Sequence, residues 1–437
     1  MNKQCDLHSM LFASWKDAGT PKRIMVALSG GGDSVALFDL LWYMVQKCDV
    51  KLAAVHVNHH LRSSAEQDAA FCRQLCKDRG VALYEMDVYP KSPSENDART
   101  ARYDAFSSAY TAWNGDVLAL AHHASDQAET VLMHLLRGTG SRGMAGMKKE
   151  SSLRLSSGVT LRLWRPLLGI QPQDLRRYAQ ANNLNWCEDE TNQTTVYSRN
   201  YLRNEIIPRL EARFAGAQDA ICRTAETIAL ENQWMEEQVT AFLKAHGAVR
   251  GPLCFLMYAP FAALHPAMKR RVMQHFLPAE QDYALLVDAA SIKPGDTVNL
   301  KSRETLHATD KYIFRIPGNP VDFTIPPLRT VDGKGSPGDG IRCQRLPKLL
   351  YEKCSLRRRL PGDVIQPFGM SGSKTLSDYL TDRKIEKPFR DYLPILAVDN
   401  RVIWVIGVGP GEEARCTMGQ PSVFLEYSDK LPYDLDF

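Results

Sequence analysis

Short apolar runs alternate with amphipathic segments over the first 140 residues of the chain. Four runs rich in Val, Leu and Ala have the length of buried strands, at residues 24–28, 52–58, 81–88 and 117–121. Segments long enough for crossover helices follow them, at residues 34–46, 64–79, 97–113 and 125–136. This alternation favours a parallel sheet, because parallel neighbours need long connections. We therefore predict an α/β fold, to which residues 161–168 add a strand and residues 172–182 a helix.

The pattern changes beyond residue 215. Longer amphipathic stretches at residues 220–243 and 268–276 predict a mainly helical domain over residues 216–320, with weaker strand signals near its end. Pro and Gly gather at residues 325–327 and 333–340, which is typical of a linker region. Short runs such as residues 401–408 predict a small C-terminal α+β domain over residues 321–437. Three domains agree with a length of 437 residues, which exceeds what one core supports.

Composition places the chain among ordinary globular proteins. Hydrophobic residues make up 44% and charged residues 24%, which permits a buried core. We see neither a leader-like apolar segment at the N-terminus nor an apolar run of about 18 residues, so we expect a cytoplasmic protein without membrane contact. The ten cysteines are scattered without a C-x-x-C pair, which is typical of a reducing compartment. A net charge of +4 is too small to indicate a nucleic-acid partner, so local charge must decide.

The candidate chemistry begins where the first predicted strand meets the first predicted helix. The sequence there is SGGGDS, with Ser29, Gly30, Gly31, Gly32, Asp33 and Ser34. Glycines let backbone N–H groups approach a polyanion, and the start of a helix attracts phosphate. A carboxylate repels phosphate, so Asp33 makes sense as the holder of a magnesium ion that bridges phosphates. The alternative is a glycine-rich turn in which Asp33 or Ser34 caps the helix.

The loop resembles the SGGxDS signature of the N-type ATP pyrophosphatases, which cleave ATP between its α and β phosphates. That superfamily includes synthetases and tRNA-modifying enzymes, so the loop indicates adenylation and leaves the acceptor open. Further motifs narrow the resemblance: HVNHHLR at residues 56–62, ENDARTARY at 95–103, AHHASDQAET at 121–130, LRG at 136–138, SRNYLR at 198–203 and IPRL at 207–210. Together they look like the tRNA(Ile)-lysidine synthetase family, over nearly the whole chain. Gln127 and Thr191 stand where that family often has Asp and Ser.

The resemblance implies a Rossmann-like catalytic domain, of the adenine nucleotide α hydrolase-like type, over residues 1–215. It also implies an activity: ATP adenylates the C2 carbonyl oxygen of the wobble cytidine in tRNA(Ile) with a CAU anticodon. The ε-amine of L-lysine then displaces AMP and forms lysidine. The implied cofactors are ATP and Mg2+, and the implied partners are that tRNA and L-lysine. The oligomeric state stays open, with a homodimer among the alternatives.

Several residues suit this reaction. Arg99 and Arg102 lie one helical turn apart and could neutralise phosphate charge on one face, so Arg99 joins Asp33 and Asp126 as a candidate catalytic residue. Asp126 and Glu129 are also one turn apart and are candidates for gripping the lysine ammonium. Their alternative roles are an N-terminal helix charge and a solvated salt bridge. We place His122 and His123 near the adenosine or the substrate, although histidines at a strand end are more often packed than catalytic.

Local charge supports an RNA partner. Residues 341–390 contain 12 Lys or Arg and 5 Asp or Glu, whereas residues 391–437 contain 3 and 8. Cations in such a cluster can follow RNA phosphates without reading sequence, although a solvated charged surface is the alternative. We expect the domain over residues 216–320 to contact tRNA and the domain over residues 321–437 to bind it. The tRNA-binding candidates are Arg199, Arg203, Arg357, Arg358, Arg359, Lys374, Arg383, Lys384, Lys387 and Arg390.

Two other functions stay under comparison. A tRNA thiolase should show paired reactive or cluster-binding cysteines, and a degenerate tRNA-binding protein should have lost Asp33 or a loop glycine. Neither feature fits this sequence. An amidotransferase-type member would also need a glutaminase domain, which the domain lengths do not suggest.

Overall fold

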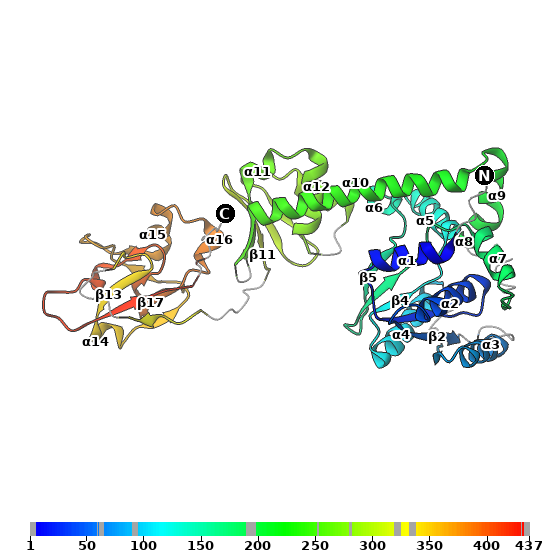
Figure 1. The fold of residues 1–437 in the computed structure, drawn as a ribbon. Helices are drawn as coiled ribbons and strands as arrows, with labels where there is room; N and C mark the ends of the chain where they lie inside the picture. Colours follow the sequence, from blue (N-terminus) through cyan, green and yellow to red (C-terminus); the bar gives the residue numbers. More distant parts are fainter. Residues whose placement is uncertain are drawn as a thin grey trace. The chain divides into compact units, whose positions relative to one another are not determined.

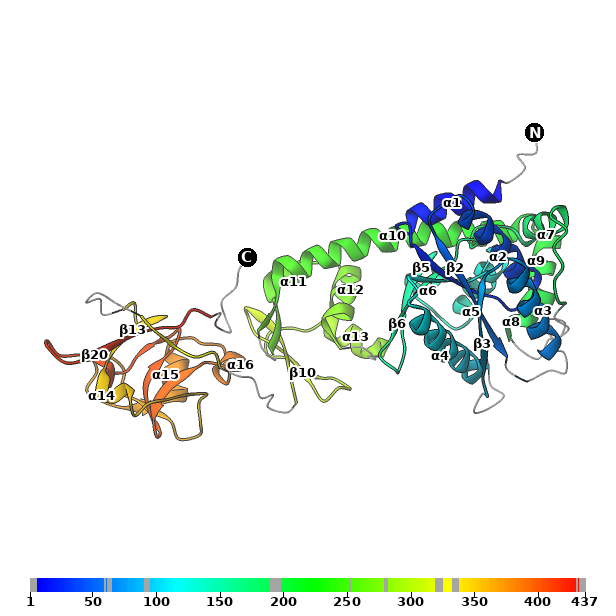
Figure 2. The ribbon, with the colours of Figure 1, turned by 60° about the horizontal axis from the view of Figure 1, so that its bottom comes forward.

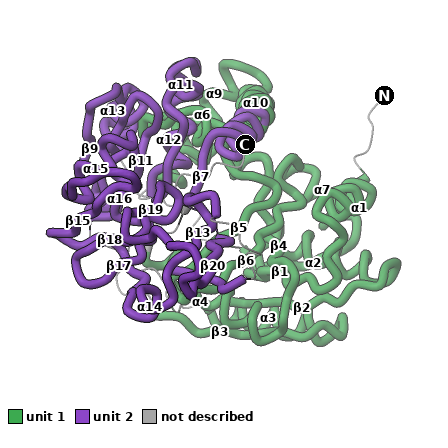
Figure 3. Tube along the Cα trace, turned by 90° about the vertical axis from the view of Figure 1, so that its left-hand side faces the viewer, with its two compact units in different colours: residues 1–233 green, residues 234–437 purple. Residues whose placement is uncertain are grey.

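The structure is a computed structural model that describes residues 6–58, 60, 65–89, 95–188, 198–250, 253–278, 282–318, 325–331, 338–429 and 431. It divides into two compact units, residues 1–233 and 234–437 (Figure 3). The boundary falls inside α10 (Ala217–His246), a helix of 30 residues. The domain boundaries near residues 215 and 320 stay predictions, and most of the predicted linker at 333–340 lies outside the described residues.

A six-stranded sheet forms the centre of the first unit, with the strand order β3-β2-β1-β4-β6-β5 (Figures 1 and 2). Each neighbouring pair is parallel except β5 and β6, which are antiparallel. This confirms the parallel α/β sheet, whereas the antiparallel edge strand β5 was not expected from the sequence. The strands are β1 (Arg23–Ala27), β2 (Lys51–Asn58), β3 (Ala82–Asp87), β4 (Val117–Ala119), β5 (Glu150–Arg154) and β6 (Thr160–Trp164).

Helices pack on both faces of this sheet because successive strand residues point to opposite sides. Ile24 and Val26 belong to one buried cluster and Met25 to another. Residues of α1, α2, α3 and α7 complete the first cluster, and residues of α4 complete the second. The helices are α1 (Leu7–Asp17), α2 (Gly32–Val45), α3 (Ala65–Asp78), α4 (Glu95–Trp113), α5 (Ala124–Leu136), α6 (Ser141–Met144), α7 (Pro172–Ala181), α8 (Ser198–Tyr201) and α9 (Ile207–Arg213).

The order of the strands reverses direction between β1 and β4. The chain leaves β1 for β2 on one side, and after β3 it returns to β4 on the other side of β1. In an open parallel sheet this reversal leaves a crevice outside the carboxyl ends of the two strands. The SGGGDS loop follows β1 and the paired histidines follow β4, so both belong at this crevice.

The second unit has separate sheets with their own cores. A five-stranded sheet, β7-β8-β11-β10-β9, packs with helices α11, α12 and α13, so strands accompany the helices that the sequence predicts there. Its elements are β7 (Gly247–Arg250), β8 (Leu253–Met257), α11 (Tyr258–Ala262), α12 (Pro266–Phe276), α13 (Tyr283–Ala290), β9 (Thr297–Asn299), β10 (Thr305–Ala308) and β11 (Tyr312–Ile316).

The C-terminal part contains two small sheets, β12-β20-β13 and β14-β17-β18-β15-β16, with β19 paired to β18. This agrees with the predicted small α+β region. Its elements are β12 (Arg329–Thr330), β13 (Cys343–Pro347), α14 (Lys348–Tyr351), β14 (Ser355–Arg357), β15 (Val364–Ile365), β16 (Lys374–Thr375), α15 (Leu376–Asp382), α16 (Lys387–Arg390), β17 (Ile395–Val398), β18 (Arg401–Val405), β19 (Gly409–Pro410) and β20 (Ser422–Glu426). Among the described residues, no helix has the length and apolarity that crossing a bilayer requires.

Candidate functional site

The SGGGDS loop leaves the backbone at the start of α2 open toward solvent. Gly31 is the N-cap residue and makes no side-chain capping hydrogen bond. Gly30 has a φ of +92°, a conformation that residues with a Cβ rarely adopt. The Ser34 hydroxyl donates to the Gly31 carbonyl over 2.8 Å, and the Ser29 hydroxyl donates to Ser34 over 3.1 Å. The helix-cap alternative for Asp33 or Ser34 is therefore wrong, and the first amides of α2 remain available to an anion.

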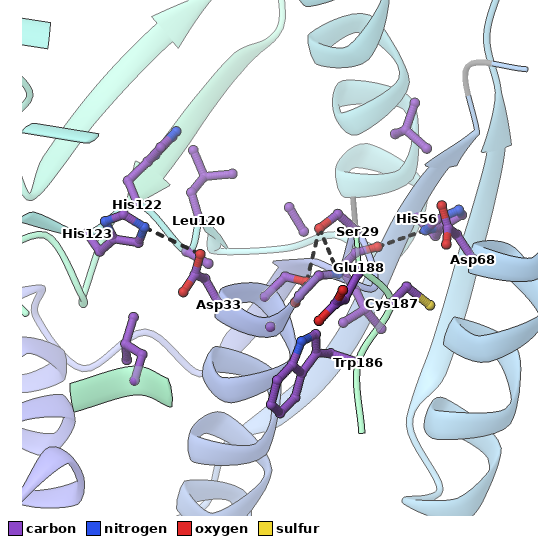
Figure 4. A pocket seen from close by; sticks show the side chains of 18 of the residues that line it. Ser29, Asp33, His56, Asp68, Leu120, His122, His123, Trp186, Cys187 and Glu188 are labelled. Atoms are coloured by element: carbon purple, nitrogen blue, oxygen red, sulfur yellow. Dashed lines mark hydrogen bonds and ion pairs between the residues drawn. The ribbon is translucent and has the colours of Figure 1, made fainter. Parts of the chain in front are cut away.

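Asp33 lies in the first turn of α2 and reaches across to the loop after β4 (Figure 4). One of its carboxylate oxygens is 3.3 Å from Nε2 of His123, and its side chain is 44% exposed. Asp126 flanks the same imidazole, with Oδ2 3.5 Å from Nδ1, and accepts the backbone N–H of His123 over 3.0 Å. Burial opposes a charge on His123, but hydrogen bonding to Asp33 and the charges of both aspartates raise its pKa above the ordinary value. The His123 imidazole thus links the first turns of α2 and α5, and the two aspartates favour its protonated form.

Glu129 is fully buried beneath two guanidinium groups. Arg199 donates from Nε over 2.9 Å, and Arg203 donates from Nε over 2.6 Å and from Nη2 over 3.0 Å. Arg203 also donates to Asp126 over 2.9 Å. The carboxylates predicted to grip lysine and two of the arginines predicted to contact tRNA therefore meet in one ion-pair cluster. In this arrangement an ammonium would reach Glu129 only by displacing its arginines.

One arginine of the cluster formed by Asp126, Glu129, Arg199 and Arg203 lies in an unusual helical turn. Residues 202–206 form a π-helical segment between α8 and α9, which includes Arg203. Burial raises the pKa of Asp126, but the attraction of His123 in its protonated form, the hydrogen bond from the His123 backbone N–H and the charge of Arg199 outweigh it, so the pKa is lowered. Asp126 is therefore an anion at neutral pH.

His122 differs from its neighbour in charge state. Arg165 donates from Nε to His122 Nδ1 over 3.2 Å, and is itself held by the Lys148 carbonyl and the Ser151 hydroxyl at 2.9 and 3.0 Å. Burial lowers the pKa of His122 to about 3, and Arg165 adds to this effect. An imidazole whose Nδ1 accepts a hydrogen bond carries its proton on Nε2. His122 is thus a neutral hydrogen-bond donor, whereas the aspartates beside His123 favour protonation of that ring.

Asp33, His122, His123 and Arg203 line a cavity of about 1280 Å3 at the carboxyl ends of β1 and β4, which we call the switch-point pocket, whereas Asp126, Glu129, Arg165 and Arg199 are not among its lining residues. Of the predicted site residues, Ser29, Gly31, Gly32, Asp33, Ser34 and Arg203 line it. Arg102 also lines it, whereas the Arg99 guanidinium lies over the ring of Tyr103 at 5.1 Å. The other lining residues come from the end of β1, β2, α3, α4, the segment after β4, the first turn of α5, α7, residues 186–188 and the π-helical segment. The volume suits a nucleotide together with a second small group.

One wall of the switch-point pocket could not be predicted from the sequence. Residues 186–188 lie against the SGGGDS loop, where the Cys187 N–H donates to the Gly30 carbonyl over 2.9 Å. A Cβ on Gly32 would lie 3.5 Å from the indole of Trp186, which is an ordinary van der Waals contact, so this packing does not itself require glycine. Cys72 and Cys187 both approach Gly30, but burial raises the pKa of each thiol, which makes neither a ready nucleophile.

The structure also shows which groups could hold a metal ion. Asp33 presents a half-exposed carboxylate beside the amides of α2, a donor set that suits magnesium bound jointly by one carboxylate and phosphate oxygens. Among the described residues, no group of three or more His, Cys, Asp or Glu side chains has the arrangement of a metal cage. His59 and residues 189–192 of the sequence motifs lie outside the described residues.

The C-terminal basic residues fall into two groups. Some are held by internal partners: Arg357 makes a two-pronged ion pair with buried Asp363 at 2.8 and 2.9 Å, Arg359 donates to Asp391, Lys374 to Asp382, and Arg390 to the Ile385 carbonyl. Arg358 and Arg383 lie over tyrosine rings. Arg383, Lys384 and Lys387 are exposed. This last group has the solvent access that a phosphate contact needs.

In comparisons with known proteins, two family models match separate parts of the chain. Residues 6–210 match the PP-loop domain family, and residues 354–427 match the TilS substrate C-terminal domain. A curated protein of Caldanaerobacter subterraneus subsp. tengcongensis, named tRNA(Ile)-lysidine synthase, is 29% identical over 447 residues, covering 93% of this chain and 94% of that protein. The protein of that name from Geobacter sulfurreducens is 28% identical over 438 residues, covering 91% of each.

A solved structure is also similar over about half of the chain. It is the U34-tRNA thiolase NcsA from Methanococcus maripaludis with its [4Fe-4S] cluster. It is 18% identical, covers 52% of this chain and 80% of its own, and has a TM-score of 0.43. A likeness at this level carries no argument about function.

Proposed function

This chain belongs to the tRNA(Ile)-lysidine synthase family, and from that premise we propose that the switch-point pocket catalyses lysidine formation. ATP adenylates the C2 carbonyl oxygen of the wobble cytidine in tRNA(Ile) with a CAU anticodon, and pyrophosphate leaves. The ε-amine of L-lysine then attacks C2, and AMP leaves. The observation that carries the proposal is the open amide cradle of the SGGGDS loop, which lines a pocket that also holds Asp33 and His123.

Adenylation requires that the β and γ phosphates be held while negative charge moves onto the leaving pyrophosphate. The backbone amides of Gly32 and Asp33 at the start of α2 are the donors that the loop offers, and the Gly31 N–H and the Ser29 and Ser34 hydroxyls, which donate within the loop, would join them by turning toward a phosphate. Arg102 brings positive charge to the same pocket, and we retain Arg99 as its neighbour one turn away. We propose that Asp33 holds Mg2+, which when bound neutralises phosphate charge.

The lysine must present a neutral ε-nitrogen while its other polar groups are held. We keep Asp126 as the candidate contact for a lysine ammonium, because its carboxylate is anionic and part of it remains accessible. Glu129 then has a different role, because its carboxylate holds the side chains of Arg199 and Arg203 in position. In this assignment Arg203, which lines the pocket, is available to the carboxylate of lysine or to RNA phosphate.

The substrate is a tRNA, and we propose that exposed cations of the C-terminal sheet region bind its phosphates. Arg383, Lys384 and Lys387 are the members of the predicted set with exposed side chains. Binding of this kind adds affinity without sequence readout.

Because tRNA modification takes place in the cytoplasm, we propose that compartment for the protein. A homodimer stays an open prediction, which sedimentation of the purified protein tests.

Replacement of Asp33 tests the adenylation site. Asp33→Ala should abolish pyrophosphate release in the presence of ATP, Mg2+ and CAU-anticodon tRNA, while tRNA binding measured by filter retention stays within twofold of wild type. Asp49→Ala is the matched control, because that carboxylate is 96% exposed and does not line the pocket. If tRNA binding fell together with pyrophosphate release, Asp33 would be a structural residue and its assignment would be wrong.

A further inference from the structure

Two aromatic rings form a stacked pair where neighbouring strands end. His60 follows β2 and Tyr89 follows β3, and their ring centroids are 5.1 Å apart with an interplanar angle of 8°. The strands hold the rings in register, since Asn58 pairs with Asp87 and the Val88 N–H donates to the Asn58 carbonyl over 2.9 Å. The pair is therefore built on the rigid edge of the sheet.

The position of His60 is fixed by more than the stack. Its Nε2 donates to Asp87 Oδ1 over 2.7 Å, and its backbone N–H donates to the buried Asn58 side chain over 2.9 Å. Its φ of +51° lies in the left-handed region, which costs free energy for a residue with a Cβ. Strain that the surrounding contacts impose on a single residue is commonly found at binding sites.

The location of the pair connects it to the switch-point pocket. His60 and Asn58 line that pocket, whereas Tyr89 lies outside the lining and is 76% exposed. The stack therefore runs from the pocket wall outward and ends on an open tyrosine ring. A large exposed aromatic ring beside a ligand cavity is a surface that can receive a flat partner.

We propose that the His60–Tyr89 stack is a platform for the RNA base next to the cytidine that enters the pocket. The proposal rests on the proposed function. A base that leaves its stack to enter a pocket exposes the faces of its neighbours, and an aromatic ring at the pocket edge replaces the lost contact. Asp87 beside His60 repels phosphate, so the platform takes the uncharged face of a base.

The test uses the full chain and a CAU-anticodon stem-loop in which 2-aminopurine replaces the adenosine that follows the target cytidine. Stacking on Tyr89 should quench its fluorescence on binding, and Tyr89→Ala should abolish the quenching. Loss of one stacked base should also raise the KM for CAU-anticodon tRNA in pyrophosphate release roughly 5- to 150-fold, with the KM for ATP unchanged. Tyr89→Phe retains the ring and should behave as wild type.

Tyr43→Ala is the matched control, since that tyrosine is 37% exposed and does not line the switch-point pocket. The platform is refuted if Tyr89→Ala retains the quenching and a KM for tRNA within twofold of wild type, and the proposed function then still stands. If the wild-type protein adds no lysine to any tRNA, the proposed function fails. In that event the fluorescence experiment still tests whether the base stacks on Tyr89, because it measures binding and does not require catalysis.

Discussion

Removal of the Glu129 carboxylate provides a sharp test of the ion-pair cluster. The side chain is fully buried and accepts three hydrogen bonds from Arg199 and Arg203, at 2.6 to 3.0 Å. Glu129→Gln keeps the shape but leaves two largely covered guanidinium groups without their main counter-charge. Breaking a buried ion pair from one side costs about 3–5 kcal/mol. For a unit of this size that corresponds to a fall in Tm of roughly 6–20 °C.

The assay is urea and thermal unfolding of wild type and variant, followed by circular dichroism. Glu66→Gln is the control, because Glu66 pairs with Arg73 on the surface, where such a pair contributes about 0–1 kcal/mol. A double variant, Glu129→Gln with Arg199→Gln, should recover part of the loss because it removes one uncompensated cation. If Glu129→Gln changed stability no more than Glu66→Gln and raised only the KM for lysine, Glu129 would contact lysine and our reading of the cluster would be refuted.

Other predictions follow from the same structure. Gly30→Ala places a Cβ at a φ of +92°, so it should cost about 1–2 kcal/mol of stability and weaken ATP binding measured by calorimetry; an unchanged affinity would contradict the required loop conformation. Because folding raises the pKa of His123, the protonated side chain stabilises the folded state fully below its ordinary pKa of 6.5. This contribution is lost as pH rises through the higher pKa of the folded state. The free energy of unfolding of His123→Gln should therefore differ from that of wild type most at acidic pH. A difference that grew toward alkaline pH would mean that the pKa of His123 shifts in the other direction. Arg357→Ala leaves buried Asp363 unpaired and should destabilise by about 3–5 kcal/mol, whereas Lys384→Ala should leave stability unchanged and lower the salt dependence of tRNA binding by about one ion.

The parallel sheet and the glycine-rich loop could be predicted from the sequence because the signals for strands and turns are local. Strands buried on both faces read as apolar runs, and the glycine-rich turn after residue 28 reads as an anion cradle. The parallel sheet, the pocket position of the SGGGDS loop and the family were therefore accessible from the sequence. The antiparallel strand β5 was missed because residues 150–154 contain mainly Ser and charged residues, and only pairing with β6 makes them a strand.

The site was harder to predict because its key contacts join distant segments. Asp126 and Glu129 have the spacing of a solvated helix face, and nothing local shows that Arg199 and Arg203 cover them. The contrast between His122 and His123 has the same origin. The pKa values of these adjacent residues shift in opposite directions because His122 is buried beside Arg165, whereas His123 contacts Asp33. Residues 186–188 form a pocket wall through a backbone hydrogen bond, which has no signature in side-chain type.

The central claim is that this protein joins lysine to a tRNA cytidine at the cost of one ATP cleaved to AMP and pyrophosphate. The most direct measurement incubates the purified protein with ATP, Mg2+, labelled lysine and tRNA(Ile) bearing a CAU anticodon, and counts pyrophosphate released against lysine bound to RNA. We predict equal amounts of the two, and no incorporation when the wobble cytidine is replaced by uridine. Absent incorporation, or a preference for another amino acid, would contradict the account.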